Sequence, residues 1–305
     1  MIRELAPRGL VLTDDAMLGL FFIQRYRFLT IDQFARAAGM KRPAASDRLR
    51  ELERHGVLGH FGNIGMPGYG KTPKVYFLKR KGFVLLTRES GIPPELIGTH
   101  KETHVESRWS PQMFHRLRTV DLMIALEVAV RARAHLSLVK TFLEYRLVKR
   151  GTRLLRETTD FIASDETTEN RIVPDGAFVL ENVETGRRGL FFLEMDMATE
   201  RIVARISHDK RITLRYKIEQ YDRYLTSGRF AETYASYGEF RAFTLLFVTL
   251  TAARIDNIRR ALADLPAVLA DYYRFSTFDK AHADFFAEHW ASRSPDDPKR
   301  YIIAR

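Results

Sequence analysis

The sequence predicts an α/β protein, α+β overall, in which a small helical domain precedes a larger domain with a mixed sheet. Helical patterns and a short hairpin fill the first 90 residues, a stretch containing Gly and Pro follows, and apolar strands then alternate with amphipathic helices. The length of 305 residues is enough for two domains. We expect a first domain over residues 1–90, a linker over 91–110, an α/β domain over 111–290 and a tail over 291–305.

The composition of the chain indicates the cellular compartment in which the protein is expected. Hydrophobic residues make up 45% of the chain, which supports real cores. The chain has no cysteine, which excludes disulfide frameworks and thiolate metal sites. It has no signal-peptide pattern, and its longest apolar stretch is too short to span a bilayer. We expect a cytoplasmic protein with no membrane partner.

The charge of the chain favours a polyanionic partner. The formal net charge is +11, and residues 1–90 alone hold 16 Lys and Arg against 8 Asp and Glu, a net +8. A basic excess concentrated in one domain is typical of nucleic-acid binding.

The first 90 residues predict a helix-turn-helix. Thr13 can cap a first helix, and Thr30 caps a second over residues 31–38. Gly39 then supplies the turn, and a third helix follows over residues 43–55, with its apolar stripe facing inward.

A hairpin follows the third helix. Residues 57–61 and 74–78 are predicted strands, and the Gly-rich segment between them is typical of a wing. In a winged helix-turn-helix the third helix enters the major groove and the wing lies over the neighbouring backbone. A helix-turn-helix that makes only protein contacts is the alternative. The residues expected to contact double-stranded DNA are Lys41, Arg42, Ser46, Arg48, Arg50, Lys71 and Lys74.

The wing contains a pattern that imitates a nucleotide-binding loop. Residues 65–72 match G-x-x-x-x-G-K-[ST]. That loop works between a buried strand and a helix whose amides hold phosphate. No apolar strand precedes Gly65, and Pro73 followed by a β-like run comes after Thr72. We therefore assign no nucleotide-binding residues, and we expect Lys71 to meet a DNA phosphate.

The rest of the chain predicts a three-layer α/β domain, because helices are expected on both sides of a mixed sheet. The expected elements are a helix over 112–134, strands over 136–145, 171–180 and 188–196, a helix over 211–225, a strand over 240–249, and helices over 253–273 and 279–290.

Acidic residues gather at the ends of two predicted strands. Glu194 and Asp196 close one strand and share a face of it, and a neighbouring strand can bring Asp175 beside them. Carboxylates that converge at the end of an apolar hairpin are costly unless a cation or proton offsets their charge. Lys217, beside the apolar stripe of the following helix, is a candidate cation.

This order of elements and acids resembles the PD-(D/E)xK nuclease superfamily. The resemblance implies that Asp175 and Glu194 bind a divalent metal such as Mg²⁺, which polarises a phosphodiester and activates water. The candidate catalytic residues are Asp175, Glu194, Asp196 and Lys217. The superfamily lysine is expected where this chain has Asp196, and Lys217 could supply it instead. The alternative is that Lys217 only forms a salt bridge with the acids.

A narrower likeness covers about residues 10–250. Its motifs are the winged helix, His115 with Val120-Asp121, Pro174-Asp175, residues 191–196 with Thr199-Glu200, and Lys217 with Tyr221 and Tyr224. In this order they resemble the replication-relaxation proteins of plasmids and mobile elements. The resemblance implies a role in plasmid replication or transfer, with DNA and replication or conjugation proteins as partners.

We therefore expect a DNA-binding protein whose winged helix supplies most of the affinity, followed by a nuclease-like domain. One alternative is an active Mg²⁺-dependent DNA endonuclease or nickase. Another is a winged-helix transcriptional regulator whose C-terminal domain senses a ligand or forms a homodimer.

Overall fold

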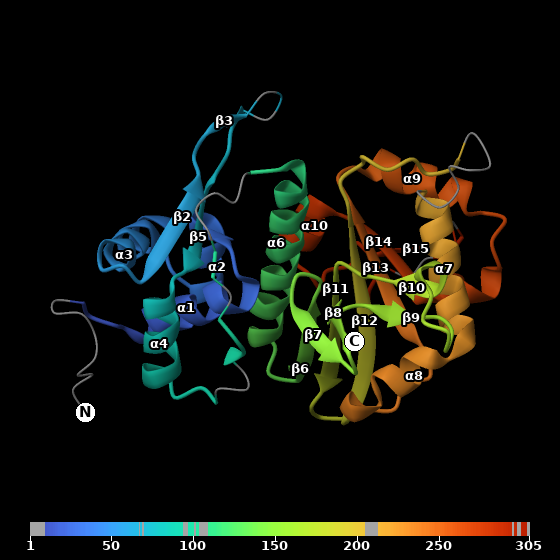
Figure 1. The fold of residues 1–305 in the computed structure, drawn as a ribbon. Coiled ribbons are helices and arrows are strands. Elements are labelled where there is room, and N and C mark those ends of the chain that lie inside the picture. The colour runs from blue at the N-terminus through green and yellow to red at the C-terminus, as the bar shows by residue number, and fades with distance from the viewer. Residues whose placement is uncertain are drawn as a thin grey trace. The chain divides into compact units, whose positions relative to one another are not determined.

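The computed structural model is a mixed α/β protein that separates into two compact units, Met1–Ile124 and Ala125–Arg305 (Figure 1). The predicted α/β class with a mixed sheet is confirmed. The division falls inside helix α6 (Pro111–Arg131), which contributes to both units. The structure describes residues 10–66, 68, 70–93, 97–100, 102–103, 109–204, 213–294, 296–297 and 300–303.

Three helices begin the N-terminal unit, at the positions that the sequence predicts. They are α1 (Asp14–Tyr26), α2 (Ile31–Ala38) and α3 (Arg42–Arg54). Helix α2 starts with a capping box, in which the Thr30 hydroxyl accepts from the Gln33 amide while the Gln33 side chain accepts from the Thr30 amide. Two otherwise unpaired backbone donors are satisfied in this way, which fixes where the helix begins.

A tight turn separates α2 from α3. Gly39 has φ of 69°, a left-handed conformation that glycine adopts without strain, and its amide donates to the carbonyls of Ala35 and Arg36. Pro43 in the first turn of α3 suits the start of a helix. Leu49 and Leu52 are fully buried, so the predicted inner stripe of α3 does pack inward.

A three-stranded sheet completes this unit, in the order β1-β5-β2. Strands β3 and β4 pair as a short antiparallel ladder that extends the β2–β5 hairpin, and the chain runs from β4 directly into β5. The segment that imitates a nucleotide-binding loop is therefore a β-hairpin followed by a strand, with Pro67 and Tyr69 outside the described residues. The elements are β1 (Leu29–Thr30), β2 (Leu58–Gly62), β3 (Gly65–Met66), β4 (Gly70–Lys71), β5 (Lys74–Leu78) and α4 (Arg80–Glu89), a helix that the sequence analysis missed.

A six-stranded mixed sheet forms the centre of the C-terminal unit. Strands β12, β13 and β14 are parallel, whereas β11 pairs antiparallel with β12 and β6, and β15 antiparallel with β14. In sheet order the strands are β15 (Ala291–Ser292), β14 (Tyr273–Thr277), β13 (Phe243–Thr249), β12 (Arg187–Asp196), β11 (Gly176–Asn182) and β6 (Leu136–Leu143).

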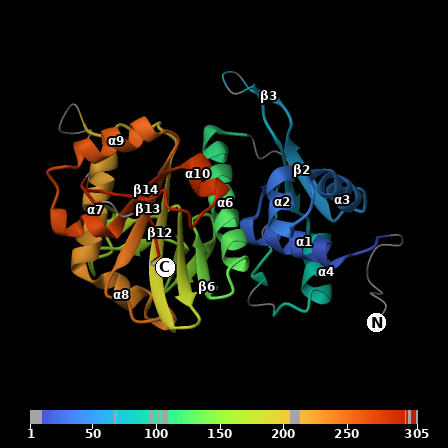
Figure 2. The same ribbon diagram turned by 180° about the vertical axis from the view of Figure 1, so that it is seen from behind.

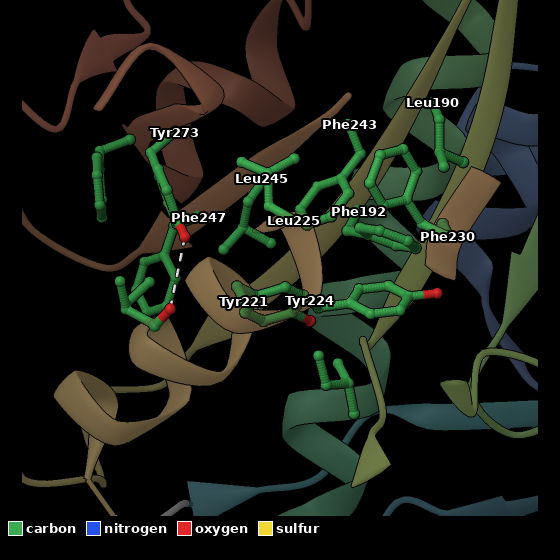
Figure 3. Close-up of a cluster of buried hydrophobic side chains, with 14 of the residues drawn as sticks. Leu190, Phe192, Tyr221, Tyr224, Leu225, Phe230, Phe243, Leu245, Phe247 and Tyr273 are labelled. Atoms are coloured by element: carbon green, nitrogen blue, oxygen red, sulfur yellow. Dashed lines mark hydrogen bonds between the residues drawn. The ribbon is translucent and has the colours of Figure 1, made fainter. Parts of the chain in front are cut away.

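Helices lie on both sides of this sheet (Figures 1 and 2). Helices α7 (Leu214–Ser227), α8 (Arg229–Thr233) and α9 (Ala252–Ala261) cover one face, and α10 (Phe278–Ala283) lies on the other. The α7 face holds an aromatic core in which the Phe192 and Phe243 rings lie 4.7 Å apart (Figure 3). Short 3₁₀ turns complete the unit at Thr168–Asn170, Ala235–Tyr237 and Ala267–Tyr272.

The predictions for the last third of the chain need correction. The helix expected over residues 253–273 ends at Ala261, and Tyr273–Thr277 forms the parallel strand β14. Pro266 cannot continue a helix, and the run that follows is rich in aromatic and β-branched residues. The helix expected over 279–290 likewise ends at Ala283, and the short strand β15 follows.

Small ribbons were also missed between β6 and β11. The strand expected over residues 171–180 is interrupted near Pro174, so only its second part joins the large sheet. The additional strands are β7 (Leu147–Arg150), β8 (Arg153–Arg156), β9 (Asp160–Phe161) and β10 (Arg171–Ile172). Within the described part of the chain, no helix is long and apolar enough to cross a membrane.

The packing of α1 on α2 gives a stability prediction. A methyl group at Gly19 would overlap the ring of Phe34, which is fully buried. We expect Gly19→Ala to lower the free energy of unfolding by about 1–3 kcal/mol, although alanine is the better helix former by about 1 kcal/mol. Urea denaturation measures the change. In the double variant with Phe34→Leu the two losses should not add, and a more stable Gly19→Ala protein would contradict the assignment.

Candidate functional site

Two of the predicted acids meet at the start of β11 and the end of β12. Gly176 pairs with Leu193, so Asp175 lies opposite Glu194 as the antiparallel ladder continues. The Met195 amide donates to Asp175 Oδ2 at 2.8 Å, which fixes this carboxylate against β12. Both side chains are buried, with 8% of Asp175 and 1% of Glu194 exposed.

Helix α7 supplies the partners of Glu194. The Tyr221 hydroxyl donates to Oε1 at 2.5 Å, and the Lys217 ammonium lies 2.6 Å from Oε2. These residues are four apart and therefore share one face of the helix. Tyr221 belongs to the aromatic core as well, beside Phe192 (Figure 3). The apolar packing of α7 thus places its polar groups on the buried carboxylate.

The charges of this cluster depend on one another. Burial raises the pKa of Glu194, Lys217 opposes that rise, and Asp175 adds to it. Burial disfavours the charge on Lys217, but Glu194 and Asp175 outweigh that effect and raise the pKa of its ammonium. The 2.6 Å approach is that of an ion pair, so Lys217 is the group that favours the charged form of Glu194 against the effect of burial.

Asp196 shares the face of β12 with Glu194 but has different partners. Arg254, on α9, donates to both of its carboxylate oxygens, at 2.6 and 3.1 Å. The Thr249 hydroxyl donates to Oδ2 at 2.8 Å from the neighbouring strand β13. This bidentate pair ties α9 to the end of β12. Asp196 is thus bound by Arg254, whereas Asp175 and Glu194 face Lys217.

The side chains of this cluster can be compared with the donor groups that the predicted metal site requires. Asp175, Glu194 and Lys217 are the two carboxylates and one lysine that the nuclease resemblance implies, so the donor types fit. A cation bound to Glu194 would, however, have to compete with the ammonium that already balances its charge. Among the described residues, no three His, Asp or Glu side chains gather in a way that could hold a metal ion.

The predicted DNA-contacting residues fall into two groups. Arg42 and Arg50 expose about two thirds of their side chains, 66% and 65%, and form ion pairs with exposed acids of their own surface, Asp32 and Asp47. This accessible group also includes Lys41 and Lys71, which are exposed, and Ser46, which is half-buried.

The second group is held against the protein. Arg48 exposes only 19% of its side chain and donates to Glu51 at 2.6 Å and to the Val11 carbonyl at 3.0 Å. Lys74 lies 3.0 Å from Glu53. The sequence analysis missed these neutralising contacts because it considered the basic residues without their acidic neighbours.

Asp121, a residue of the predicted family motif, connects two helices of the N-terminal unit through Gln33. The Gln33 side-chain amide donates to Asp121 Oδ1 and to the Leu117 carbonyl, each at 2.9 Å, and so links α2 to α6. Burial raises the pKa of Asp121 to about 6, although the hydrogen bond from Gln33 opposes the rise. Asp121 therefore serves the packing of α2, the helix that precedes the turn into α3.

Sequence reasoning missed the buried acid Asp160. The Tyr234 hydroxyl donates to Asp160 Oδ2 at 2.7 Å, and the Arg150 guanidinium lies 3.5 Å from Oδ1. Burial raises the pKa of Asp160 to about 6, against the effect of Tyr234 and Arg150. Asp160 stands in a short polar segment, and nothing in the local pattern distinguishes it from an exposed loop residue.

Comparison with known proteins gives one match. A family model described as Replication-relaxation matches residues 20–239, more than half of the chain. The match includes α3 of the N-terminal unit and the Asp175, Glu194 and Lys217 cluster of the C-terminal unit. No curated protein and no solved structure matches.

The buried ion pair gives a pH-dependent prediction. Lys217→Met leaves Glu194 buried beside Asp175 without a cation, and we expect a loss of about 3 kcal/mol of unfolding free energy near pH 8. The pKa of Glu194 in the folded variant then lies far above its unfolded value of about 4.3. The folded state holds a proton that the unfolded state releases, so the variant should lose stability as pH rises from about 5 to 8.

Denaturation across this pH range measures the effect. The double variant Lys217→Met/Glu194→Gln removes the unpaired carboxylate and should recover most of the loss at high pH. A Lys217→Met protein whose stability deficit is the same at both ends of the range would contradict the ion-pair assignment.

Proposed function

The chain belongs to the replication-relaxation family, and on that premise we propose that it binds double-stranded DNA in the replication or transfer of plasmids or mobile elements. The observation that carries the proposal is the solvent-facing surface of α3. Helix α3 follows α2 after a turn at Gly39, as in a helix-turn-helix. Its outer surface presents Lys41, Arg42 and Arg50 to solvent. The net charge of +8 over residues 1–90 supports a polyanionic ligand.

The architecture of the N-terminal unit supports a winged-helix mode of binding. Three helices are followed by the β2–β5 hairpin, whose distal ladder carries the exposed Lys71. In this mode α3 lies in the major groove, and Lys71 contacts a phosphate of the neighbouring backbone. The tip of the hairpin can follow the backbone because it is a two-stranded extension beyond the packed part of the sheet.

Energetics decide which cations are available to DNA. The pairs of Arg42 with Asp32 and of Arg50 with Asp47 are exposed, and such pairs contribute about 0–1 kcal/mol. A phosphate or a guanine edge can replace those acids at little cost. Arg48 is held in a half-buried pair, so its role is to position α3 rather than to read DNA.

We expect Arg42→Ala and Arg50→Ala each to weaken binding to a labelled duplex about fivefold or more, because a specific arginine contact contributes about 1–3 kcal/mol. Lys41→Ala should reduce the slope of log affinity against log salt by about one unit. Gel-shift titrations from about 50 to 200 mM salt measure both quantities.

Arg187→Ala is the matched control, because it removes one exposed charge from the start of β12 in the other unit. The groove-binding assignment fails if the Arg42→Ala/Arg50→Ala protein binds the duplex as tightly as this control.

Metal-dependent DNA cleavage is a second candidate function. One observation favours it: Asp175, Glu194 and Lys217 lie together although they come from three separate elements. Asp175 and Glu194 would hold the metal, which would polarise a phosphodiester. Lys217 would then move from Glu194 toward the developing negative charge. Its side chain is one-third exposed, so this movement needs no opening of the core.

Cleavage predicts nicking of supercoiled plasmid with Mg²⁺ or Mn²⁺. Glu194→Gln and Lys217→Ala should each lower the nicking rate about 100-fold or more. Glu219→Gln is the control, because Glu219 lies on the same helix and faces Arg215 instead. Nicking that persists in Glu194→Gln, or a wild-type protein that leaves plasmid intact with both metals, would count against this candidate.

A further inference from the structure

An exposed basic β-hairpin stands between β6 and β9 in the C-terminal unit. Its strands pair antiparallel, with Leu147 opposite Arg156 and Lys149 opposite Leu154. Gly151, with φ of 59°, permits the two-residue turn at its tip. Figure 1 shows β7 and β8 in light green beside β6, an edge strand of the large sheet.

The cations of this segment exceed its acids. Residues 140–157 contain six basic and two acidic side chains, a net +4. Both acids lie at the base: Glu144 pairs with Arg156, and the buried Glu157 lies 3.5 Å from Arg146. Toward the tip, Arg153 pairs with Glu166 at 3.1 Å and Arg150 lies 3.5 Å from Asp160. Within the described part of the chain, Lys149 is therefore the tip cation that is left for solvent or a ligand. The six cations are Lys140, Arg146, Lys149, Arg150, Arg153 and Arg156.

Leucine and cation alternate on one face of the ribbon. Cross-strand partners share a face, so Leu147, Lys149, Leu154 and Arg156 lie on the same side. Leu147 exposes 44% of its surface and Leu154 65%, although buried leucine is the rule. This face packs on nothing in the described part of the chain that would remove its leucines from water.

The opposite face and the base are anchored. Arg150 donates to the Thr159 carbonyl at 2.6 Å and to the Glu157 carbonyl at 3.1 Å. The Glu157 side chain also accepts from the Leu143 amide at 2.9 Å. The end of β6 and the base of the hairpin therefore share one buried carboxylate. A ribbon fixed at its base presents its free face in one orientation, which a flexible loop would not.

We propose that the free face of β7–β8 is a second DNA-contacting surface, on the unit that carries the acidic cluster. Lys149 and Arg156 contact phosphates, and Leu154 packs against a sugar or a base edge. A two-stranded ribbon fits the major groove, and leucine side chains also serve as apolar wedges in the minor groove. The proposal rests on the proposed function, because DNA is its ligand.

Charge and area favour DNA over a protein partner. A stable protein interface buries about 800 Å² on each side around a contiguous apolar centre. Two leucines separated by cations offer no such centre. The alternation suits a ligand that presents phosphates beside apolar sugars at short intervals. Arg156 exposes 55% of its side chain and Glu144 28%, so this pair lies partly in solvent and costs less to break than a buried pair.

The test compares two surface double variants of the full chain. Lys149→Ala/Leu154→Ser alters the free face, whereas Val183→Ser/Arg187→Ala makes the same kind of change in the β11–β12 turn, where Val183 is 51% exposed. Because all these side chains are exposed, both proteins should unfold at the wild-type temperature. We expect the first to bind a labelled duplex about tenfold more weakly, with a salt slope smaller by about one. The second should bind like the wild type.

A photoreactive side chain at position 154 adds a direct readout, and it should cross-link to the labelled duplex. Wild-type affinity and slope in Lys149→Ala/Leu154→Ser, or the absence of a DNA cross-link, would overturn the proposal. If that happens while Arg42→Ala/Arg50→Ala still weakens binding, only the hairpin proposal fails. If the hairpin variant alone loses affinity, the hairpin proposal stands and the α3 assignment fails. A wild-type chain that binds no duplex overturns both.

Discussion

The buried carboxylate of Glu194 is the constraint on which the C-terminal unit depends. A charge at the end of a central strand is expensive, and Lys217 and Tyr221 of α7 compensate for it. Two residues further on, Arg254 of α9 compensates the charge of Asp196 in the same way. Helices α7 and α9 are therefore held to β12 by charge as well as by the aromatic core. Removal of either cation would leave an acid in the interior with its compensation lost.

These two pairs also show that a lysine at position 196 would not fit this structure. A lysine there would face the guanidinium of Arg254, and two cations would meet where a bidentate pair now forms. Lys217 approaches Glu194 from the next helix instead. Asp196, Arg254 and Lys217 thus form a self-consistent set of charges. Asp196 does not by itself mark a damaged nuclease centre, because its carboxylate has a complete set of structural partners.

The N-terminal helices could be predicted from local features such as caps and turns. Contacts between residues far apart in the sequence could not be predicted. The bounds of α2 follow from the Thr30–Gln33 capping box and from Gly39, all within ten residues. The sequence does not indicate strand β14, because its place in the sheet depends on β13 and not on its own periodicity. At the site, the sequence indicated Asp175, Glu194 and Lys217. It could not indicate Arg254, which lies 58 positions from Asp196 along the chain.

The same energetic distinction separates structural cations from those available to a ligand. Lys217 and Arg254 balance buried acids, and breaking such pairs costs about 3–5 kcal/mol. Arg42 and Arg50 lie in exposed pairs that contribute about 1 kcal/mol or less, and Lys149 is exposed on its ribbon. A phosphate can compete for the second class but not for the first. The net charge of +11 therefore overstates the number of cations that a polyanionic ligand could reach, and which cations are available follows from burial rather than from the count of basic residues.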